Sequence, residues 1–235
     1  MKNYILIVFV FLFSCHLIAQ EEIKEKRKFR FPIWSYHDTS SDILGVSVGL
    51  IPETISNSKK TSRTFGLRVE ADPTSALFFL FGGGDNLANN IEQYGKVMNT
   101  EINQKVYGLN ISSGNINGVD LYGVSINTLM QFSRKSNGIS IAGFLNQTER
   151  ANGILVAGGG NQSFISNGLI VSFFNNETQV LKGIQMAAQN HVLAGGYGIQ
   201  IGLWNQAKNF RGVQLGLWNK NDKRSLPLIN WQFKG

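Results

Sequence analysis

Short apolar segments recur along the chain, and each begins at a glycine. Aliphatic residues stand one and three positions after that glycine, as Val124 and Ile126 do after Gly123. Residues two positions apart share a face of an extended strand, so this spacing predicts β-strands with one aliphatic face. The glycines follow one another at intervals of 15 residues, with a last interval of 14: Gly108, Gly123, Gly138, Gly153, Gly168, Gly183, Gly198 and Gly212.

Asparagine precedes the repeat glycine in three units, at Asn137-Gly138, Asn152-Gly153 and Asn167-Gly168. Asn and Gly tolerate positive φ, which a two-residue hairpin turn or a solenoid corner requires. We therefore expect the repeat glycines to meet a backbone requirement rather than to supply a chemical group.

The first half of the chain is less regular. Residues 43–51 and 65–70 predict two strands, and the apolar run 76–81 predicts a strand buried on both faces, followed by a glycine turn. Residues 87–101 have the weakest pattern and suit either a short helix or a loop.

Two architectures fit a strand and a polar link that together span 15 residues. In the first, the chain is all-β and forms an antiparallel meander that closes into a small outer-membrane-type β-barrel of roughly 10 to 14 strands. In the second, a parallel β-solenoid, each 15-residue unit is one coil, and the aliphatic residues stack in ladders. Both architectures are expected to bury the aliphatic residues.

Three features favour the barrel. Neither strand face carries the charges of a water-facing solenoid surface. A two-residue Asn-Gly turn leaves an odd number of residues per strand, which keeps the residues flanking each turn on one face. The chain ends in an alternating segment, Ile229, Trp231 and Phe233, which resembles the closing strand of outer-membrane barrels.

The chain is expected to be exported as one repeat-built domain. Residues 1–19 have the pattern of a signal peptide, with Lys2 before an apolar run and Ala19 before the cleavage point. Residues 20–42 are expected to be a leader and 43–235 the β domain, with regular repeats over 108–225 and the closing strand over 226–233. Cys15, the single cysteine, lies in the signal segment and could instead receive a lipid anchor.

Composition and charge exclude several classes of function. The net charge is +7, and charged residues make up 16% of the chain. Part of the basic excess lies in residues 24–30, where interleaved glutamates argue against a nucleic-acid-binding arm. His37 and His191 are far apart in the sequence, and the carboxylates are scattered. We therefore expect no catalytic residue, no metal site and no cofactor. Asn-X-Ser/Thr sequences at Asn110, Asn146, Asn161 and Asn176 are expected by chance in an Asn-rich repeat.

The last 36 residues, GIQIGLWNQAKNFRGVQLGLWNKNDKRSLPLINWQF, carry tandem G-[VI]-Q-[IL]-G-L-x-N motifs and an LPLINW segment. In these motifs the chain resembles a family of Gram-negative bacterial surface-repeat proteins. The resemblance implies a location at the outer membrane or cell surface, and it implies no activity or substrate.

The sequence thus predicts a non-enzymatic outer-membrane or cell-surface protein with a structural, adhesive or narrow-pore role. A secreted or lipid-anchored β-solenoid that acts as a binding or adhesion module is the alternative. The expected partners are outer-membrane lipid and the barrel-insertion machinery for a barrel, or a surface glycan or protein ligand. Nucleic acid is not expected.

Overall fold

The computed structural model describes residues 27–38, 40–50, 61–72, 75, 87–114 and 119–233, which form a 14-stranded sheet and the helix α3 (Ile91–Asn99). The predicted signal segment, Cys15 and the apolar run 76–81 lie outside the described residues. The strands are β1 (Lys28–Arg30), β2 (Ile33–Ser35), β3 (Ser41–Gly49), β4 (Ser62–Glu70), β5 (Gln104–Ser112), β6 (Asp120–Asn127), β7 (Met130–Ala142), β8 (Leu145–Ala157), β9 (Gly160–Ser172), β10 (Asn175–Met186), β11 (Gln189–Ile201), β12 (Trp204–Ala207), β13 (Phe210–Lys220) and β14 (Ser225–Gln232).

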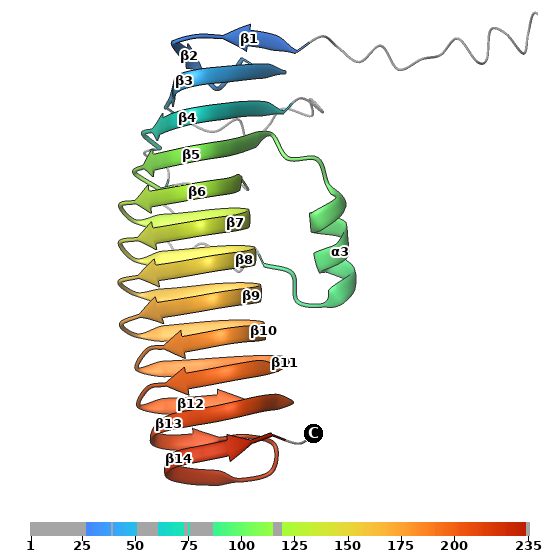
Figure 1. The fold of residues 1–235 in the computed structure, drawn as a ribbon, viewed down its shortest axis with the longest axis vertical. Coiled ribbons are helices and arrows are strands. Elements are labelled where there is room, and N and C mark those ends of the chain that lie inside the picture. The colour runs from blue at the N-terminus through green and yellow to red at the C-terminus, as the bar shows by residue number, and fades with distance from the viewer. Residues whose placement is uncertain are drawn as a thin grey trace, which may run out of the picture.

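The fold is a parallel β-solenoid, and the prediction of a barrel is wrong. Consecutive strands of a meander barrel run antiparallel, whereas every neighbouring pair from β3 to β13 is parallel. Each coil stacks on the one before it and builds the elongated body in Figure 1. The alternative prediction, a parallel solenoid with 15-residue coils, is confirmed.

The repeat glycines set the register of the stack. Gly138 pairs with Gly123 on one side and with Gly153 on the other, and Gly45 and Gly66 join the same column at its beginning. These glycines have the expected positive φ, near +130° at Gly138, but they lie inside strands rather than at a hairpin turn or a solenoid corner. Equivalent residues of successive coils therefore stand about 4.8 Å apart along the axis.

Each coil has two strand segments that face one another across a narrow interior. The Gln214 side chain, which follows the repeat glycine, reaches across this interior and donates from Nε2 to the Lys220 carbonyl at 3.0 Å. Lys220 therefore belongs to the wall opposite the glycine column. The chain turns from one wall to the other at residues 143–144. It turns back at residue 149, which is left out of the β8–β9 pairing between Thr148 and Arg150.

The aliphatic residues face outward, which corrects the expectation that they are buried. Val124 and Ile126 are 37% and 43% exposed, whereas Ser125 between them is 1% exposed. The interior is apolar only in part, with a cluster formed by Ala151, Leu155, Ile170, Leu181, Val192, Ala207 and Phe210. Much of the remaining interior is filled by Ser, Asn and Gln side chains.

The two ends and one side of the solenoid carry additional elements. At the N-terminal end, β1 and β2 fall within the predicted leader and pair in parallel with β3. At the C-terminal end, the predicted closing segment forms β14, which pairs antiparallel with β13 and ends the stack. Between β4 and β5 the chain leaves the coil path, and α3 packs on the flank of the solenoid (Figure 1).

Candidate binding surface

The glycine column has a steric cause that the sequence does not reveal by itself. A Cβ added at Gly123 would come within 2.2 Å of the Gly108 carbonyl oxygen in the preceding coil. The backbones approach so closely at this column that a side chain has no room. The repeat glycines are therefore structural, and their function is to hold the coils in register.

An asparagine ladder runs along the interior. Asn161 donates from Nδ2 to Asn176 Oδ1 at 2.9 Å and accepts from Asn146 Nδ2 at 3.0 Å. The same Nδ2 also donates to the Val171 carbonyl at 2.8 Å, which satisfies a backbone group at the turn. The pattern continues through Asn190, Asn205 and Asn219. Buried amides stacked in this way satisfy one another, so they stabilise the interior beside the apolar cluster.

Glutamine forms a second ladder near the C-terminal end. Gln200 donates from Nε2 to Gln185 Oε1 at 2.9 Å, and Gln214 donates to Gln200 Oε1 at 2.8 Å. All three side chains are buried. The Gln of the G-[VI]-Q-[IL]-G-L-x-N motif is thus an interior residue, and the Asn that ends the motif belongs to the asparagine ladder.

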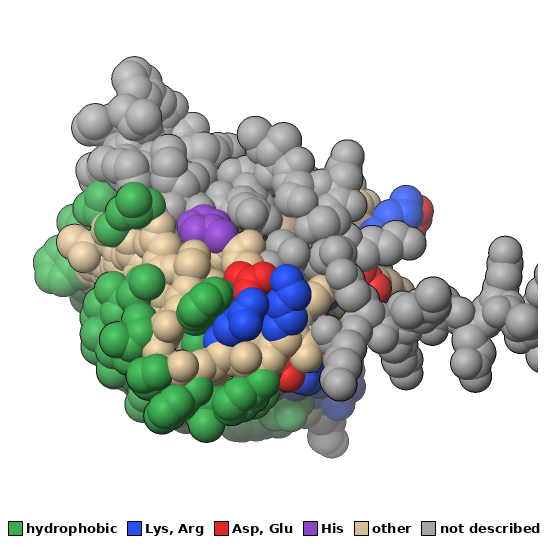
Figure 2. Space-filling model, turned by 90° about the horizontal axis from the view of Figure 1, so that it is seen from above, with side chains coloured by type: hydrophobic (Ala, Val, Ile, Leu, Met, Phe, Trp, Pro, Cys, Tyr) green, Lys and Arg blue, Asp and Glu red, His purple; other side chains and the backbone are tan. Residues whose placement is uncertain are grey.

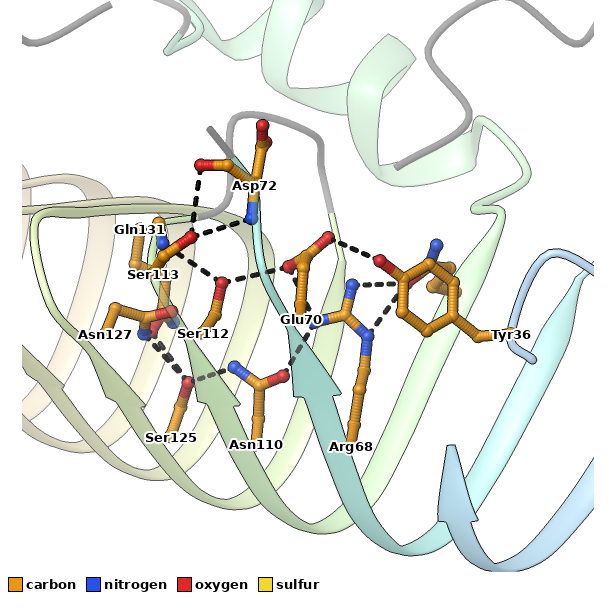
Figure 3. A network of polar contacts seen from close by, with 12 residues as sticks. Tyr36, Arg68, Glu70, Asp72, Asn110, Ser112, Ser113, Ser125, Asn127 and Gln131 are labelled. Atoms are coloured by element: carbon orange, nitrogen blue, oxygen red, sulfur yellow. Dashed lines mark hydrogen bonds and ion pairs between the residues drawn. The ribbon is translucent and has the colours of Figure 1, made fainter. Parts of the chain in front are cut away.

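A buried polar network replaces these ladders toward the N-terminal end (Figure 3). Arg68, 1% exposed, donates from Nη1 to Glu70 Oε2 at 2.8 Å and to Asn110 Oδ1 at 2.7 Å. Its guanidinium also lies 4.5 Å from the centre of the Tyr36 ring, and the Tyr36 hydroxyl donates to Glu70 Oε1 at 3.1 Å. Burial, together with the nearby Glu70 carboxylate, raises the pKa of Tyr36. These groups bind one another, so we interpret the network as structural.

The described residues on the flank of the solenoid include one buried carboxylate with an oxygen that forms no hydrogen bond. Glu149 is buried and accepts from the Ala88 backbone N–H at 2.9 Å through Oε1, while Oε2 has no hydrogen-bond partner. Burial raises the pKa of Glu149. Nearby, Tyr94 of α3 stacks on Phe164 with ring centres 4.6 Å apart, and Arg134, paired with Asp120 at 2.5 Å, donates to the Thr100 carbonyl. These contacts fasten the inserted segment to the coils.

The outer side of the glycine-bearing wall carries two unbroken aliphatic columns, which we call the apolar strip. Its residues stand one and three positions after each glycine of the column. They are Val46, Val48, Leu67, Val69, Leu109, Ile111, Val124, Ile126, Ile139, Ile141, Ile154, Val156, Leu169, Val171, Ile184, Met186, Ile199, Ile201, Val213 and Leu215. Each of these residues is exposed or half-buried, and none is charged.

The predicted closing residues extend the apolar strip. Trp231 pairs with Val213 and Ile229 with Leu215 across the β13–β14 ladder, so both side chains share the face of the strip. They are 45% and 47% exposed, while Asn230 between them is fully buried. Phe233 is exposed beyond the end of β14. Ile229 and Trp231 thus lie in a terminal strand, whereas the predicted strand residue Phe233 follows its end. The predicted role is wrong, because β14 ends a solenoid rather than closes a barrel.

Aromatic and basic side chains border the apolar strip. Large apolar residues, Phe144, Phe174, Leu203, Trp204, Leu217 and Trp218, lie exposed at the turn on one side. Three stacked rings border the strip on its other side, which we call the glycine side because each ring directly precedes a glycine of the column. They belong to Phe65, Tyr107 and Tyr122, and their centres are 4.9 and 4.8 Å apart. Viewed along the axis, the hydrophobic side chains gather on two adjacent sides of the outline (Figure 2).

The glycine side also holds a row of cations, which we call the basic margin. It consists of Lys105, Lys135, Arg150, Lys182 and Arg211, which stand one or three positions before a repeat glycine. None of them forms an ion pair with another described residue. The acidic residues of the same columns are neutralised, since Asp42 binds Arg63 at 2.5 Å and Asp120 binds Arg134 at 2.5 Å. The hydrogen bond from Arg63 lowers the pKa of Asp42.

Candidate chemistry is sparse in the part of the chain that the structure describes. There, no three His, Cys, Asp or Glu side chains are placed to hold a metal ion. Across the same residues, α3 is too short to cross a bilayer, and no other described helix is long and apolar enough to do so. His37 lies beside Tyr36, with tilted rings whose centres are 4.6 Å apart, and His191 lies in β11, so the structure does not bring the two histidines together.

Comparison with known proteins gave no relative. No family model matches the chain, and the searches of curated proteins and of solved structures returned no match.

Proposed function

We propose that this protein is an exported, non-enzymatic β-solenoid that acts as a binding module at the outer membrane or cell surface. Its contact surface is the apolar strip. The observation that carries the proposal is that two aliphatic columns continue without a charged interruption from Val46 to Leu215, on a face that no other described residue covers.

The size of the strip is unusual for a protein that stays free in water. With nine intervals of about 4.8 Å between its coils, the strip is about 43 Å long. Soluble monomers seldom expose a contiguous apolar patch larger than a few hundred Å², and larger patches mark interaction sites. A strip of this length is therefore a candidate interface.

The interior explains how the fold tolerates this arrangement. Amide ladders such as Asn146–Asn161–Asn176 supply hydrogen bonds that hold the coils together where an apolar core would otherwise be needed. The aliphatic residues are then available on the outside, where they contribute little to the packing of a single chain. The solenoid thus has a partly polar interior and an aliphatic outer face, which supports binding as the role of the outer face.

Export and the lack of enzymatic activity rest on separate observations. The apolar segment after Lys2, ending at Ala19, supports export. The described buried polar groups mostly hydrogen-bond to one another in stacked columns rather than converge on a reaction centre, which supports a non-enzymatic role.

Fractionation of a Gram-negative host that expresses the full chain tests the proposal. We expect mass spectrometry to find a mature chain that lacks residues 1–19, and protease added to intact cells to cleave it. A control chain with Leu6, Val8 and Val10 replaced by Asp should stay in the cytoplasm at full length. A wild-type chain that keeps its N-terminal segment and resists external protease would overturn the proposed location.

A further inference from the structure

We propose that the apolar strip docks flat on a lipid bilayer with anionic head groups, with the basic margin over the phosphates. This inference rests on the proposed binding role of the strip and names its partner. The observation that points to lipid is the order of side-chain types across the face: basic, aromatic, aliphatic and again aromatic.

The shape of the strip fits a planar partner. Its residues come from parallel strands in continuous register, so equivalent side chains form straight columns. The two columns project as single aliphatic side chains, which penetrate only the boundary between head groups and acyl chains. Amphipathic structures that lie in the membrane interface bury an apolar face to this shallow depth.

The aromatic borders match the chemistry of the same interface. Tyr107, Tyr122 and Tyr197 flank the glycine side, and Trp204 and Trp218 lie beyond the turn on the other side. Tyr and Trp rings concentrate at the head-group level of membranes because each has an apolar body and a polar group. The aliphatic columns are thus framed by the residues that favour the membrane–water boundary.

The positive charges of the basic margin favour lipids with anionic head groups. In the basic margin, Lys105, Lys135 and Arg150 stand in one column and Lys182 and Arg211 in a second. Asp120 shares the first column but is engaged by Arg134, so the margin presents net positive charge. Basic residues next to an apolar face attract anionic lipids, and salt weakens that attraction.

Vesicle flotation with the mature chain, residues 20–235, tests the inference. The probes are vesicles of phosphatidylcholine alone and vesicles of equal parts phosphatidylglycerol and phosphatidylcholine. We expect apparent binding to the mixed vesicles to be about tenfold tighter, and high salt to reduce that preference.

Two sets of variants separate the contributions of the strip and the margin. The strip variant Ile126→Gln, Val156→Gln, Ile199→Gln should lose binding to both kinds of vesicle, whereas Ile91→Gln on α3, which removes another exposed aliphatic residue, should bind as wild type does. The margin variant Lys182→Gln, Arg211→Gln should lose the preference for phosphatidylglycerol. The control Lys96→Gln, Lys220→Gln removes the same charge from α3 and from the opposite wall, and it should keep the preference. Far-UV circular dichroism and the thermal midpoint establish that each variant is folded.

Three outcomes overturn the inference. Absence of flotation together with sedimentation as a dimer that the strip variant abolishes would identify the strip as an interface between copies. Absence of both flotation and self-association would assign the partner to another class, such as a glycan or protein. Flotation that the strip variant leaves unchanged would place the lipid contact elsewhere. The fractionation experiment reads the location of the chain independently, so the proposed function can survive each of these results.

Discussion

Gly153 and Gly138 are paired neighbours in successive coils, and a Cβ added at Gly153 would come within 2.1 Å of the Gly138 carbonyl oxygen. Gly153 also has a φ of +134°, which residues with a side chain rarely adopt. Gly153→Ala should therefore lower the free energy of unfolding by about 2–5 kcal/mol. Urea unfolding followed by circular dichroism measures the change.

Gly95 provides the matched control for this substitution. It lies in α3, and a Cβ there would meet no atom within 4 Å. Gly95→Ala should raise local helix stability by about 0.5–1 kcal/mol, because alanine loses less backbone entropy in a helix. Equal effects of the two substitutions would contradict the steric explanation of the glycine column.

Asn161 stands in the middle of the asparagine ladder. Asn161→Ala removes the acceptor of Asn146 Nδ2 and the donor to Asn176 Oδ1 and the Val171 carbonyl. Because it leaves buried polar groups without partners, we expect a loss of about 2–4 kcal/mol in unfolding free energy. Asn167→Ala, at the end of the half-buried row in which Asn167 donates to Asn152, should cost only about 0.5–1.5 kcal/mol. A larger loss at Asn167 would show that the interior ladder is not the main source of stability.

The buried Arg68–Glu70 pair allows a double-mutant cycle. Arg68→Met leaves the Glu70 carboxylate buried without its cation, and we expect a loss of about 3–5 kcal/mol. The double variant Arg68→Met, Glu70→Met should lose less than the sum of the two single variants, since it leaves no unpaired buried charge. Additive losses in thermal or urea unfolding would mean that the two side chains do not stabilise one another.

The buried Glu149 carboxylate should make the free energy of unfolding depend on pH with a sign opposite to that of an ion-paired carboxylate. Its pKa in the folded chain is raised above its ordinary value of 4.5, so the folded state holds the proton more tightly than the unfolded state. The free energy of unfolding should consequently fall as pH rises above that value, and below it Glu149 is protonated in both states. Glu149→Gln should be about 1 kcal/mol more stable than wild type at pH 7, with a difference that vanishes near pH 4. A constant difference between these pH values would contradict the assignment.

Much of the architecture can be read from the glycine period. The interval between Gly123 and Gly138 predicts one repeating β unit of 15 residues, and the structure has that unit. The direction of pairing cannot be read in this way, because an up-and-down hairpin strand with its link and a solenoid coil require the same number of residues. One of the three features that favoured the barrel was the absence of charges from both strand faces. The structure gives that absence another cause, because one face lines the buried interior and the other is the apolar strip.

The candidate surface illustrates a second limit of the sequence pattern. Alternation at Val124, Ser125 and Ile126 shows that the strand has two different faces, but it does not say which one is inside. Aliphatic residues are normally the buried ones, and here the ladder hydrogen bonds reverse that preference. The signal for this reversal is the 15-residue recurrence of Asn146, Asn161 and Asn176, the same asparagines that match a glycosylation pattern. Arg68 and Glu70 carry a weaker signal, since two opposite charges two residues apart on a strand share a face.

The in-register stacking of coils also makes the length of the molecule adjustable. Since Gly138 meets Gly153 as Gly153 meets Gly168, removing or duplicating one whole unit among these coils preserves the register of the glycine column. Adding or removing such units would change the length of the outer face by one coil at a time and would leave both ends of the protein intact. Duplication of a unit within the gene would thus lengthen the outer face and raise the avidity for an extended target.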